Sequence, residues 1–288
     1  MTTKDTQPGN SFSKVSSPSS VVNNPHPFLE NKVKRALDRG EAVIGSMATE
    51  MRSPAIAQIL AAAGFDFIII DMEHGTYNLE TVAGIIRVAR LCGICPIVRV
   101  PDPLYHLMSA PLDAGAQGLM IPRVESREVV EGIVQSVKYP PQGLRGCSTV
   151  RGHTDYRSVE VKEFLQFANE ETLLVIQIER RRAVEEIEAL LSVEGVDVAL
   201  IGPRDLSISL GVPGESKHPI MMESTQKVVD TCRKYGVTSA IHTGDLEILK
   251  YWRDRGMRFL SYSSEVAMIS SMGSQAVAEL RSLSPTNS

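Results

Sequence analysis

The stretch FIIIDMEHG, residues 67–75, decides the fold of this chain. Its first four residues are apolar and rich in β-branched isoleucine, so neither face of an extended segment would suit water. Such a run is typical of a strand buried on both faces in a parallel sheet. Polar residues, Asp71, Glu73 and His74, follow directly. A buried strand that ends in polar groups predicts an α/β protein whose chemistry lies at the carboxyl ends of its strands.

On both sides of this stretch, short apolar runs alternate with segments of helical spacing. The predicted strands are 42–47, 67–71, 96–100, 118–122, 173–179, 196–202, 238–242 and 259–263. The predicted helices are 53–63, 79–91, 104–114, 126–137, 159–168, 183–191, 219–234, 245–255 and 266–283. Eight strand–helix units in about 250 residues are the size of a closed (β/α)8 barrel, the TIM-barrel fold. We therefore predict one barrel domain over residues 28–284.

An open, doubly wound sheet is the alternative interpretation of this alternation. Such a sheet usually carries a glycine-rich nucleotide turn after its first strand. The sequence contains neither a G-x-G-x-x-G pattern nor a P-loop, which favours the barrel.

Composition and charge narrow the class of protein. The chain has 288 residues, a net charge of −4 and a pI of about 5.9, without the basic stripe typical of nucleic-acid-binding proteins. No apolar run approaches the ~20 residues of a membrane-spanning helix, and no signal peptide begins the chain. Residues 1–27 are rich in Ser, Thr, Asn and Pro, which predicts a disordered tail. Asp5 and the lack of arginine there argue against an organelle presequence, so we expect a cytoplasmic protein.

The four cysteines do not predict a redox or zinc site. Cys92 and Cys95 form a C-x-x-C pattern. A reactive pair, however, needs to be followed in the sequence by the N-terminus of a helix, which lowers the thiol pKa. Here Pro96 and a predicted strand follow instead. A zinc site would need a second pair of ligands, which the sequence does not show. Both thiols are therefore interpreted as packing groups of a reduced, intracellular protein.

Two carboxylates at predicted strand ends are candidate metal ligands. Glu179 ends the fifth predicted strand, and Asp205 follows the sixth. Carboxylates from neighbouring strands are hard oxygen ligands that suit Mg²⁺ or Mn²⁺. Taken singly, Glu179 also fits a solvated helix start and Asp205 a helix N-cap.

Histidine and arginine complete the set of candidate side chains at this rim. His74 follows Asp71 and Glu73, and a histidine oriented by a carboxylate can act as acid or base. The alternative is a histidine satisfied by a backbone carbonyl. Arg99 ends the third predicted strand, where its burial is costly unless a substrate carboxylate or enolate oxygen meets it. The alternative is a structural salt bridge to Asp71 or Glu73. His242 ends the seventh predicted strand.

Seven motifs occur in one order along the chain. They are FIIIDMEHG (67–75), VRVP (98–101), DAGAQGLMIP (113–122), YPPQGLRG (139–146), QIE (177–179), GPRDLS (202–207) and GVPGESKHP (211–219). This ordered set resembles the metal-dependent, class II pyruvate aldolases of the HpcH/HpaI type. These are relatives of the 2-oxo-3-deoxy-acid aldolases and of citrate lyase β-like proteins. The resemblance covers residues 30–280.

The resemblance implies a barrel of the phosphoenolpyruvate/pyruvate-enolate type with a divalent metal, Mg²⁺, Mn²⁺ or Co²⁺. Glu179 and Asp205 would bind this metal. Arg99 would bind the enolate oxygen, and His74, oriented by Asp71, would serve in proton transfer. No lysine for a Schiff base lies at the predicted strand ends.

The resemblance also implies how the substrate is held. Gln177 would touch the ligand, and the amides near Arg204 and Asp205 would hold the pyruvate carboxylate. Members of this family are commonly hexamers, so a homo-oligomer is expected.

The implied activity is reversible retro-aldol cleavage of a 4-hydroxy-2-oxo acid to pyruvate and an aldehyde, through a metal-stabilised enolate. A second interpretation keeps the enolate but forms it by decarboxylation of oxaloacetate and couples it to a more elaborate acceptor, in a specialised relative similar to macrophomate synthase. A third is a barrel that binds ligand without turnover, and the intact candidate residues argue against it.

The sequence departs from the usual family pattern in three places. Thr76 stands where proline often follows EHG, arginines occupy 180–182, and Arg204 precedes Asp205 in place of a small or amide residue. The arginines are either a solvated helix face or a source of affinity for an acidic acceptor.

Overall fold

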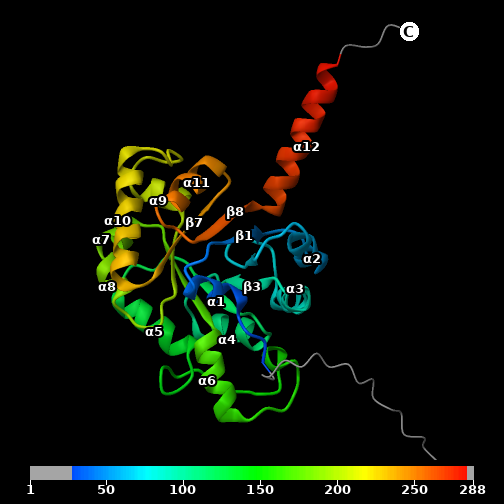
Figure 1. Cartoon of the computed structure of the whole chain (residues 1–288), viewed down its shortest axis with the longest axis vertical. Coiled ribbons are helices and arrows are strands. Elements are labelled where there is room, and N and C mark those ends of the chain that lie inside the picture. Colours follow the sequence, from blue (N-terminus) through cyan, green and yellow to red (C-terminus); the bar gives the residue numbers. More distant parts are fainter. Residues whose placement is uncertain (1–27, 284–288) are drawn as a thin grey trace, which may run out of the picture.

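The computed structural model describes residues 28–283, which form a closed barrel of eight parallel strands surrounded by helices (Figure 1). Each strand pairs with the next along the chain, and β8 closes on β1. The strands are β1 (Val43–Ala48), β2 (Phe67–Asp71), β3 (Cys95–Arg99), β4 (Gly118–Ile121), β5 (Leu173–Ile178), β6 (Val198–Ile201), β7 (Thr238–Thr243) and β8 (Phe259–Ser264). All eight overlap the predicted strands, so the TIM-barrel prediction is confirmed. The tail predicted over 1–27 lies outside the described residues, as does residue 284.

The helices alternate with the strands as predicted, with two additions. They are α1 (Lys32–Asp38), α2 (Ala55–Ala62), α3 (Leu79–Cys92), α4 (Tyr105–Asp113), α5 (Arg127–Val137), α6 (Val161–Glu171), α7 (Arg181–Glu185), α8 (Ile187–Leu191), α9 (Pro203–Ser209), α10 (Pro219–Tyr235), α11 (Leu246–Asp254) and α12 (Glu265–Ser282), with a 3₁₀ turn η1 (Gly152–Thr154). The sequence reasoning missed α1 and α9. Val33 of α1 packs with the inward residues of the barrel, and α9 begins immediately after β6.

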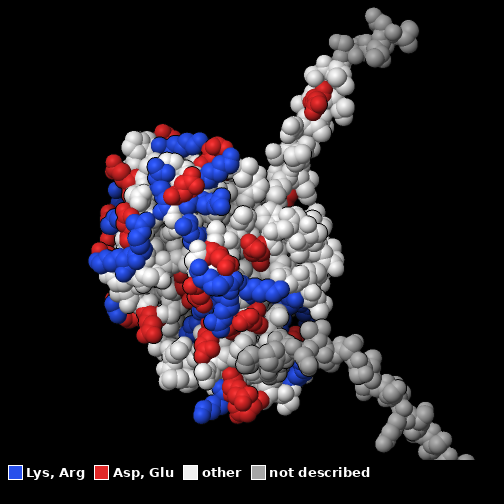
Figure 2. Space-filling model, viewed as in Figure 1, with Lys and Arg blue, Asp and Glu red and all other residues white. Residues whose placement is uncertain are grey.

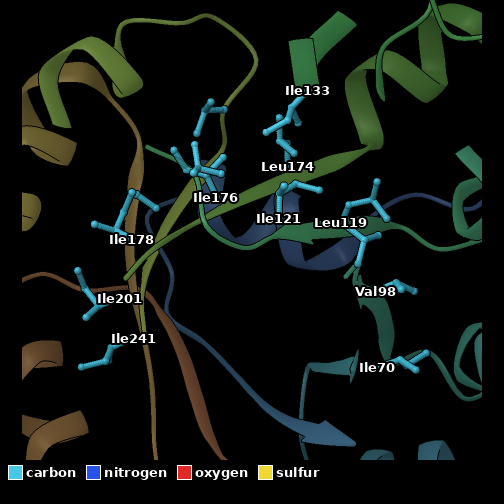
Figure 3. Packing of buried hydrophobic residues seen from close by; sticks show 14 of the residues in the cluster. Ile70, Val98, Leu119, Ile121, Ile133, Leu174, Ile176, Ile178, Ile201 and Ile241 are labelled. Carbon is cyan, nitrogen blue, oxygen red and sulfur yellow. The ribbon is translucent and has the colours of Figure 1, made fainter. Parts of the chain in front are cut away.

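Two hydrophobic layers hold the barrel together. Inside it, side chains such as Ile69, Ile97 and Val175 form one cluster, and the rings of Phe67 and Phe259 stack with their centroids 4.0 Å apart. Outside it, alternate residues of the same strands pack against the helices. Figure 3 shows part of this outer layer, with side chains from β2 to β7 and Ile133 of α5. Both faces of the strands are therefore buried, as the apolar run 67–70 predicts.

The last helix, α12, does not lie along the barrel wall. It projects away from the body of the protein (red in Figure 1), and Glu265 at its start is its only buried residue. The Glu265 carboxylate accepts hydrogen bonds from the backbone N–H groups of Thr49 (2.7 Å), Glu50 (2.7 Å) and Met51 (3.1 Å). The base of α12 is thus fixed to the loop after β1, and Met268 packs partly buried against the core, while residues 269–282 are exposed.

The face shown in Figure 2 carries lysine and arginine side chains interspersed with aspartate and glutamate. No large area of one sign is visible on that face, in keeping with the small net charge of the sequence. Among residues 28–283, no helix combines the length and hydrophobicity needed to cross a membrane.

Candidate active site

A cavity of about 610 Å³ opens at the carboxyl ends of the strands. Residues from β1, β2, β3, β5, β7 and β8 and from the start of α9 surround it. The predicted residues that line it are Asp71, His74, Arg99, Gln177, Arg204, Asp205 and His242. The fold therefore brings together candidates from segments up to 171 residues apart, here counted from Asp71 to His242.

The guanidinium of Arg99 is held by two carboxylates from the neighbouring strand end. Its Nε and one terminal nitrogen donate to the two oxygens of Asp71 at 2.8 and 2.6 Å. The other terminal nitrogen lies 3.3 Å from Glu73 Oε2. Asp71 and Arg99 are also paired in the β2–β3 register, which explains their contact. Arg99 thus forms the salt bridges to Asp71 and Glu73 that the sequence offered as the alternative. These contacts also fix the guanidinium beside the cavity.

Burial and charge act in opposite directions on this pair. Asp71 is 1% exposed and Arg99 7% exposed. Burial alone would raise the pKa of Asp71, but hydrogen bonds and charge from Arg99 more than offset it, and the pKa lies below its ordinary value. Burial would likewise lower the pKa of Arg99, and the contacts with Asp71 and Glu73 keep it raised. Both groups are therefore ionised and mutually dependent.

His74 does not contact Asp71 through its ring, contrary to the orientation that the resemblance implied. Asp71 Oδ1 accepts from the backbone N–H groups of Glu73 (2.9 Å) and His74 (3.3 Å), while its oxygens are already engaged by Arg99. The imidazole is 66% exposed, with Nε2 3.9 Å from Glu73 Oε2. Gly75 closes this turn, because a Cβ there would lie 2.1 Å from the carbonyl oxygen of Asp71. A tight turn therefore places His74 at the mouth of the cavity, with its imidazole exposed.

Glu179 is a buried carboxylate beside other negative charges. It is 3% exposed, and it accepts from the backbone N–H of Arg123 at 2.7 Å and from the side-chain amide of Gln177. Burial raises its pKa to about 7, assisted by the charges of Glu73 and Asp205 and opposed by the Arg123 hydrogen bond. Asp205 is exposed in the first turn of α9.

Gly202 permits this close grouping. A Cβ at that position would lie 2.8 Å from Gln177 Nε2 and 3.1 Å from the Cβ of Glu179. Any side chain would therefore displace the residues around Glu179.

A divalent cation fits this donor set. The negative charges of Glu73 and Asp205 act on the carboxylate of Glu179. The side-chain carbonyl oxygen of Gln177 is buried without a hydrogen-bond partner in the described chain. Within residues 28–283 no group of three or more His, Cys, Asp or Glu side chains is arranged to hold a metal. Two carboxylates with an uncommitted amide oxygen suit a hard cation that takes its remaining ligands from water and substrate, as Mg²⁺ commonly does.

Arg123 is a site residue that the sequence reasoning missed. It follows β4 with a positive φ of 56°, and this turn aims its N–H at Glu179. Its Nε lies 3.7 Å from Glu73 Oε1. The sequence did offer a signal for Arg123. It directly follows the predicted strand 118–122, and the other polar candidates also lie at or just after the ends of predicted strands.

Comparison with known proteins agrees with this geometry. Residues 49–270 match the sequence model of the HpcH/HpaI aldolase/citrate lyase family. The chain belongs to this family. It is 31% identical over 255 residues to the hydroxypyruvate/pyruvate aldolase of Roseovarius nubinhibens, covering 88% of this chain and 98% of that protein.

Solved HpcH/HpaI structures and relatives share the architecture. The family aldolase from Desulfitobacterium hafniense DCB-2 has a TM-score of 0.85 and 34% identity, covering 88% of this chain and 98% of that one. Macrophomate synthase has a TM-score of 0.75 and 27% identity, covering 88% of this chain and 89% of that one. Both therefore align over nearly the whole barrel.

The positions that depart from the usual HpcH/HpaI pattern fall into two groups. Arg180 pairs with Glu125 at 3.1 Å, and Arg181 donates to the carbonyl of Leu210, so these side chains are engaged outside the cavity. Thr76 lies on the surface, 3.3 Å from Glu50 Oε2. Arg204 alone among these positions lines the cavity, so it is the one that can act on a substrate.

Proposed function

We propose that this family member is a carbon–carbon lyase that reversibly cleaves a 4-hydroxy-2-oxo acid to pyruvate and an aldehyde. The observation that carries the proposal is a cavity that a fixed, buried guanidinium shares with Asp205 and Gln177. Glu179 is not among the lining residues, but its buried carboxylate accepts a hydrogen bond from the Gln177 amide. The guanidinium and a cation bound by the two carboxylates would both favour an enolate, which carries negative charge on the oxygen at carbon 2. The pyruvate aldolase activity in the name of the Roseovarius relative supports the same conclusion.

Arg99 stabilises the charge that develops as the bond between carbons 3 and 4 breaks. Asp71 and Glu73 hold it in place before the reaction, so the site needs no reorganisation at that moment. A divalent cation on Glu179 and Asp205 would supply Lewis-acid stabilisation of the same oxygen. Gln177 and the backbone N–H groups of Arg204 and Asp205 complete the proposed contacts to the acid.

His74 is the proposed proton-transfer residue. Its imidazole accepts the proton of the 4-hydroxyl while the bonding pair between carbons 3 and 4 passes to the enolate and the aldehyde is released. The enolate then takes up a proton at carbon 3 to give pyruvate. Because the imidazole lies at the open mouth of the cavity, it can exchange protons with solvent.

The direct test of the function is turnover of a 4-hydroxy-2-oxo acid with and without a chelator. We expect chelation to abolish pyruvate formation and Mg²⁺, Mn²⁺ or Co²⁺ to restore it. A titration of the apoprotein with Mn²⁺, followed by electron paramagnetic resonance, should show weaker binding in Glu179→Gln than in the wild type. Inactivation by borohydride in the presence of pyruvate, without any effect of metal, would instead indicate a Schiff-base enzyme.

Arg204→Ala is expected to raise KM for an acidic aldehyde more than for a neutral one. Arg204 is exposed at the cavity, so the loss should be about two- to fivefold, as for exposed charge pairs. The measurement is condensation of pyruvate with glyoxylate and with a neutral aldehyde of similar size. Arg182→Ala, an exposed arginine outside the cavity, is the matched control. Equal effects on both aldehydes would mean that Arg204 only faces solvent.

We propose further that the chain assembles with copies of itself through α12. The exposed apolar residues of this helix recur at helical spacing along one face: Val266, Ile269, Met272, Val277 and Leu280. Ile44 on β1 is also exposed, at 47%, whereas outward residues of the other strands lie beneath helices. An exposed apolar helix face and an exposed apolar side chain on β1 of the same chain fit a second copy of that chain. The hexamer expected from the family and the cytoplasmic location stay predictions.

Met272→Asp is expected to weaken this self-association by about 10- to 100-fold, because it places a charge where an apolar side chain would be buried. Sedimentation equilibrium of the full chain measures the effect. Ser271→Asp, on the opposite face of α12, is the control and should leave assembly intact. A wild type that sediments as a monomer at all concentrations would contradict the proposal.

A further inference from the structure

His242 lines the active cavity but has no role in the reaction proposed above. It lies near the end of β7 and is paired in the sheet register with Ser261 of β8. Its Nδ1 lies 2.8 Å from Ser261 Oγ. Arg99, Met47 and Gln177 line the same cavity, so the imidazole stands among the residues that surround the reacting part of a substrate.

The contact with Ser261 determines which ring nitrogen carries the proton. Ser261 is fully buried, and no other hydrogen-bond partner of its Oγ is found within residues 28–283. A buried hydroxyl requires an acceptor for its hydrogen, and Nδ1 is the acceptor within reach. The Ser261 O–H therefore donates to Nδ1, which leaves the imidazole hydrogen on Nε2.

The Nε2–H group is a neutral donor that faces the cavity. Nε2 is not among the buried side-chain atoms that lack a partner, and the residue lines the open space. Burial, together with the positive charge of Arg99, lowers the pKa of His242 to about 4, although Asp71 opposes this. At neutral pH the ring is therefore uncharged and offers one hydrogen to an oxygen on a substrate.

We propose that His242 is a specificity-determining residue that donates this hydrogen bond to a hydroxyl on carbon 3 of the enolate-forming 2-oxo acid. The inference rests on the proposed aldolase function. The oxygens on carbons 1 and 2 are already matched by the cation site and Arg99, so carbon 3 is the next position with a substituent to recognise. His242 is close enough to Arg99 for that charge to affect its pKa. His74 and Arg204 are exposed members of the lining, and the aldehyde must enter from the solvent side.

The chemistry of the donor suits a hydroxyl. A neutral N–H has no charge to match a distal carboxylate, for which Arg204 is available. Hydroxypyruvate has a hydroxymethyl group whose oxygen can accept the hydrogen bond from Nε2–H. Pyruvate has a methyl group there, so Nε2–H could donate only to water. The enzyme should therefore prefer hydroxypyruvate to pyruvate by an amount that depends on His242 and on Ser261.

The test compares hydroxypyruvate and pyruvate as donors with one neutral aldehyde, in wild type, His242→Leu, His242→Gln and Ser261→Ala. We expect His242→Leu to lower the ratio of the two kcat/KM values by about tenfold, the usual effect of one lost hydrogen bond. His242→Gln keeps a side-chain N–H and should restore most of the ratio. Ser261→Ala frees the ring to change tautomer and should lower it by less than His242→Leu. In ¹⁵N NMR spectra, His242 of the wild type should show the Nε2–H tautomer.

Several outcomes would overturn the inference. Equal losses with both donors would make His242 structural. A repeat with glyoxylate in which the loss depends on the aldehyde and not on the donor would place the contact of His242 on the acceptor. An Nδ1–H tautomer in the NMR spectra would also contradict it. If His242→Leu fails to fold, His242→Gln and Ser261→Ala still give the comparison. A wild type that condenses neither donor would overturn the proposed function itself, whereas one that condenses pyruvate alone overturns only this inference.

Discussion

Arg99→Met is expected to lower the cleavage rate by about 10²–10³-fold, the effect of losing one fixed donor to a developing oxyanion. The same substitution should destabilise the fold by about 3–5 kcal/mol at neutral pH, because it leaves a buried carboxylate without its partner. Asp71, 1% exposed, loses both of its hydrogen bonds from the guanidinium. Urea unfolding in the presence of chelator, with steady-state rates measured separately, gives the two quantities.

The loss of stability in Arg99→Met should depend on pH in a definite direction. In the wild type the pKa of Asp71 is below its ordinary value, so the stability that its ionised form contributes is present above the unfolded pKa of about 3.9 and is lost as pH falls through the folded pKa. In the variant, burial without Arg99 should raise this pKa. The difference between the two proteins should therefore be largest near pH 7 and shrink toward pH 4, where a protonated Asp71 needs no partner.

Two further variants control this result. Arg99→Lys keeps the positive charge but cannot donate the two parallel hydrogen bonds to Asp71. Relative to Arg99→Met, it should recover part of the lost stability and a smaller part of the lost rate. Arg123→Met removes an arginine that is 44% exposed and 3.7 Å from Glu73, and its effect on stability should stay below about 1 kcal/mol. A deficit in Arg99→Met that is the same at pH 7 and pH 4.5 would mean that Asp71 is not the group left unpaired.

The strands were predictable because a parallel barrel buries both of their faces. Runs such as 67–70 and 173–176 have no polar residue to place them elsewhere, and the structure buries every residue of β2 and β5. The boundaries of helices were less certain. The segment 183–191 is one predicted helix that divides at Glu186 into α7 and α8, and α9 was missed because it is only seven residues long.

Helical spacing does not reveal what a helix packs against. The segment 266–283 has the apolar period expected of a helix on the barrel wall, and α12 is indeed a helix. Its apolar face is nevertheless exposed within this chain. The helical period alone does not say whether an apolar face packs on its own chain or on another. The direction of α12 depends on the irregular end of β8, where Ser263 has a positive φ of 55°, and on the burial of Glu265. Neither is visible in a periodicity.

The sequence could predict that several of these polar residues lie at one rim of the barrel, but not which of them contact one another. Asp71, Arg99 and Glu179 follow or end strands, and parallel strands in a barrel bring such ends to one rim. Which carboxylate meets which cation depends on register and on turns. The β2–β3 register places Asp71 opposite Arg99, and this contact occupies the oxygens that had been assigned to the His74 ring. The role of Arg123 depends on its positive φ, which the sequence pattern does not encode.

His74→Ala should separate proton transfer from enolate stabilisation. Retro-aldol cleavage requires a group that accepts the 4-hydroxyl proton, so the variant should lose about 10²–10⁴-fold in rate. Decarboxylation of oxaloacetate forms the same enolate by release of carbon dioxide and has no 4-hydroxyl to deprotonate. Its rate should therefore fall much less. The two steady-state rates, measured at saturating Mg²⁺ or Mn²⁺, give the comparison, and Glu179→Ala should lower both.

The variant Asp71→Asn makes this comparison sharper. Were Asp71 the group that orients the imidazole, Asp71→Asn would resemble a milder His74→Ala and affect cleavage selectively. In the structure Asp71 contacts the guanidinium of Arg99 and only the backbone of His74. Its replacement should thus lower both rates together, as loss of Arg99 would. If His74→Ala also lowers both rates by one factor, His74 contributes to the enolate site and another group accepts the proton. His242 would be a poor substitute, because its low pKa leaves it a weak base and its cavity-facing nitrogen already carries a hydrogen.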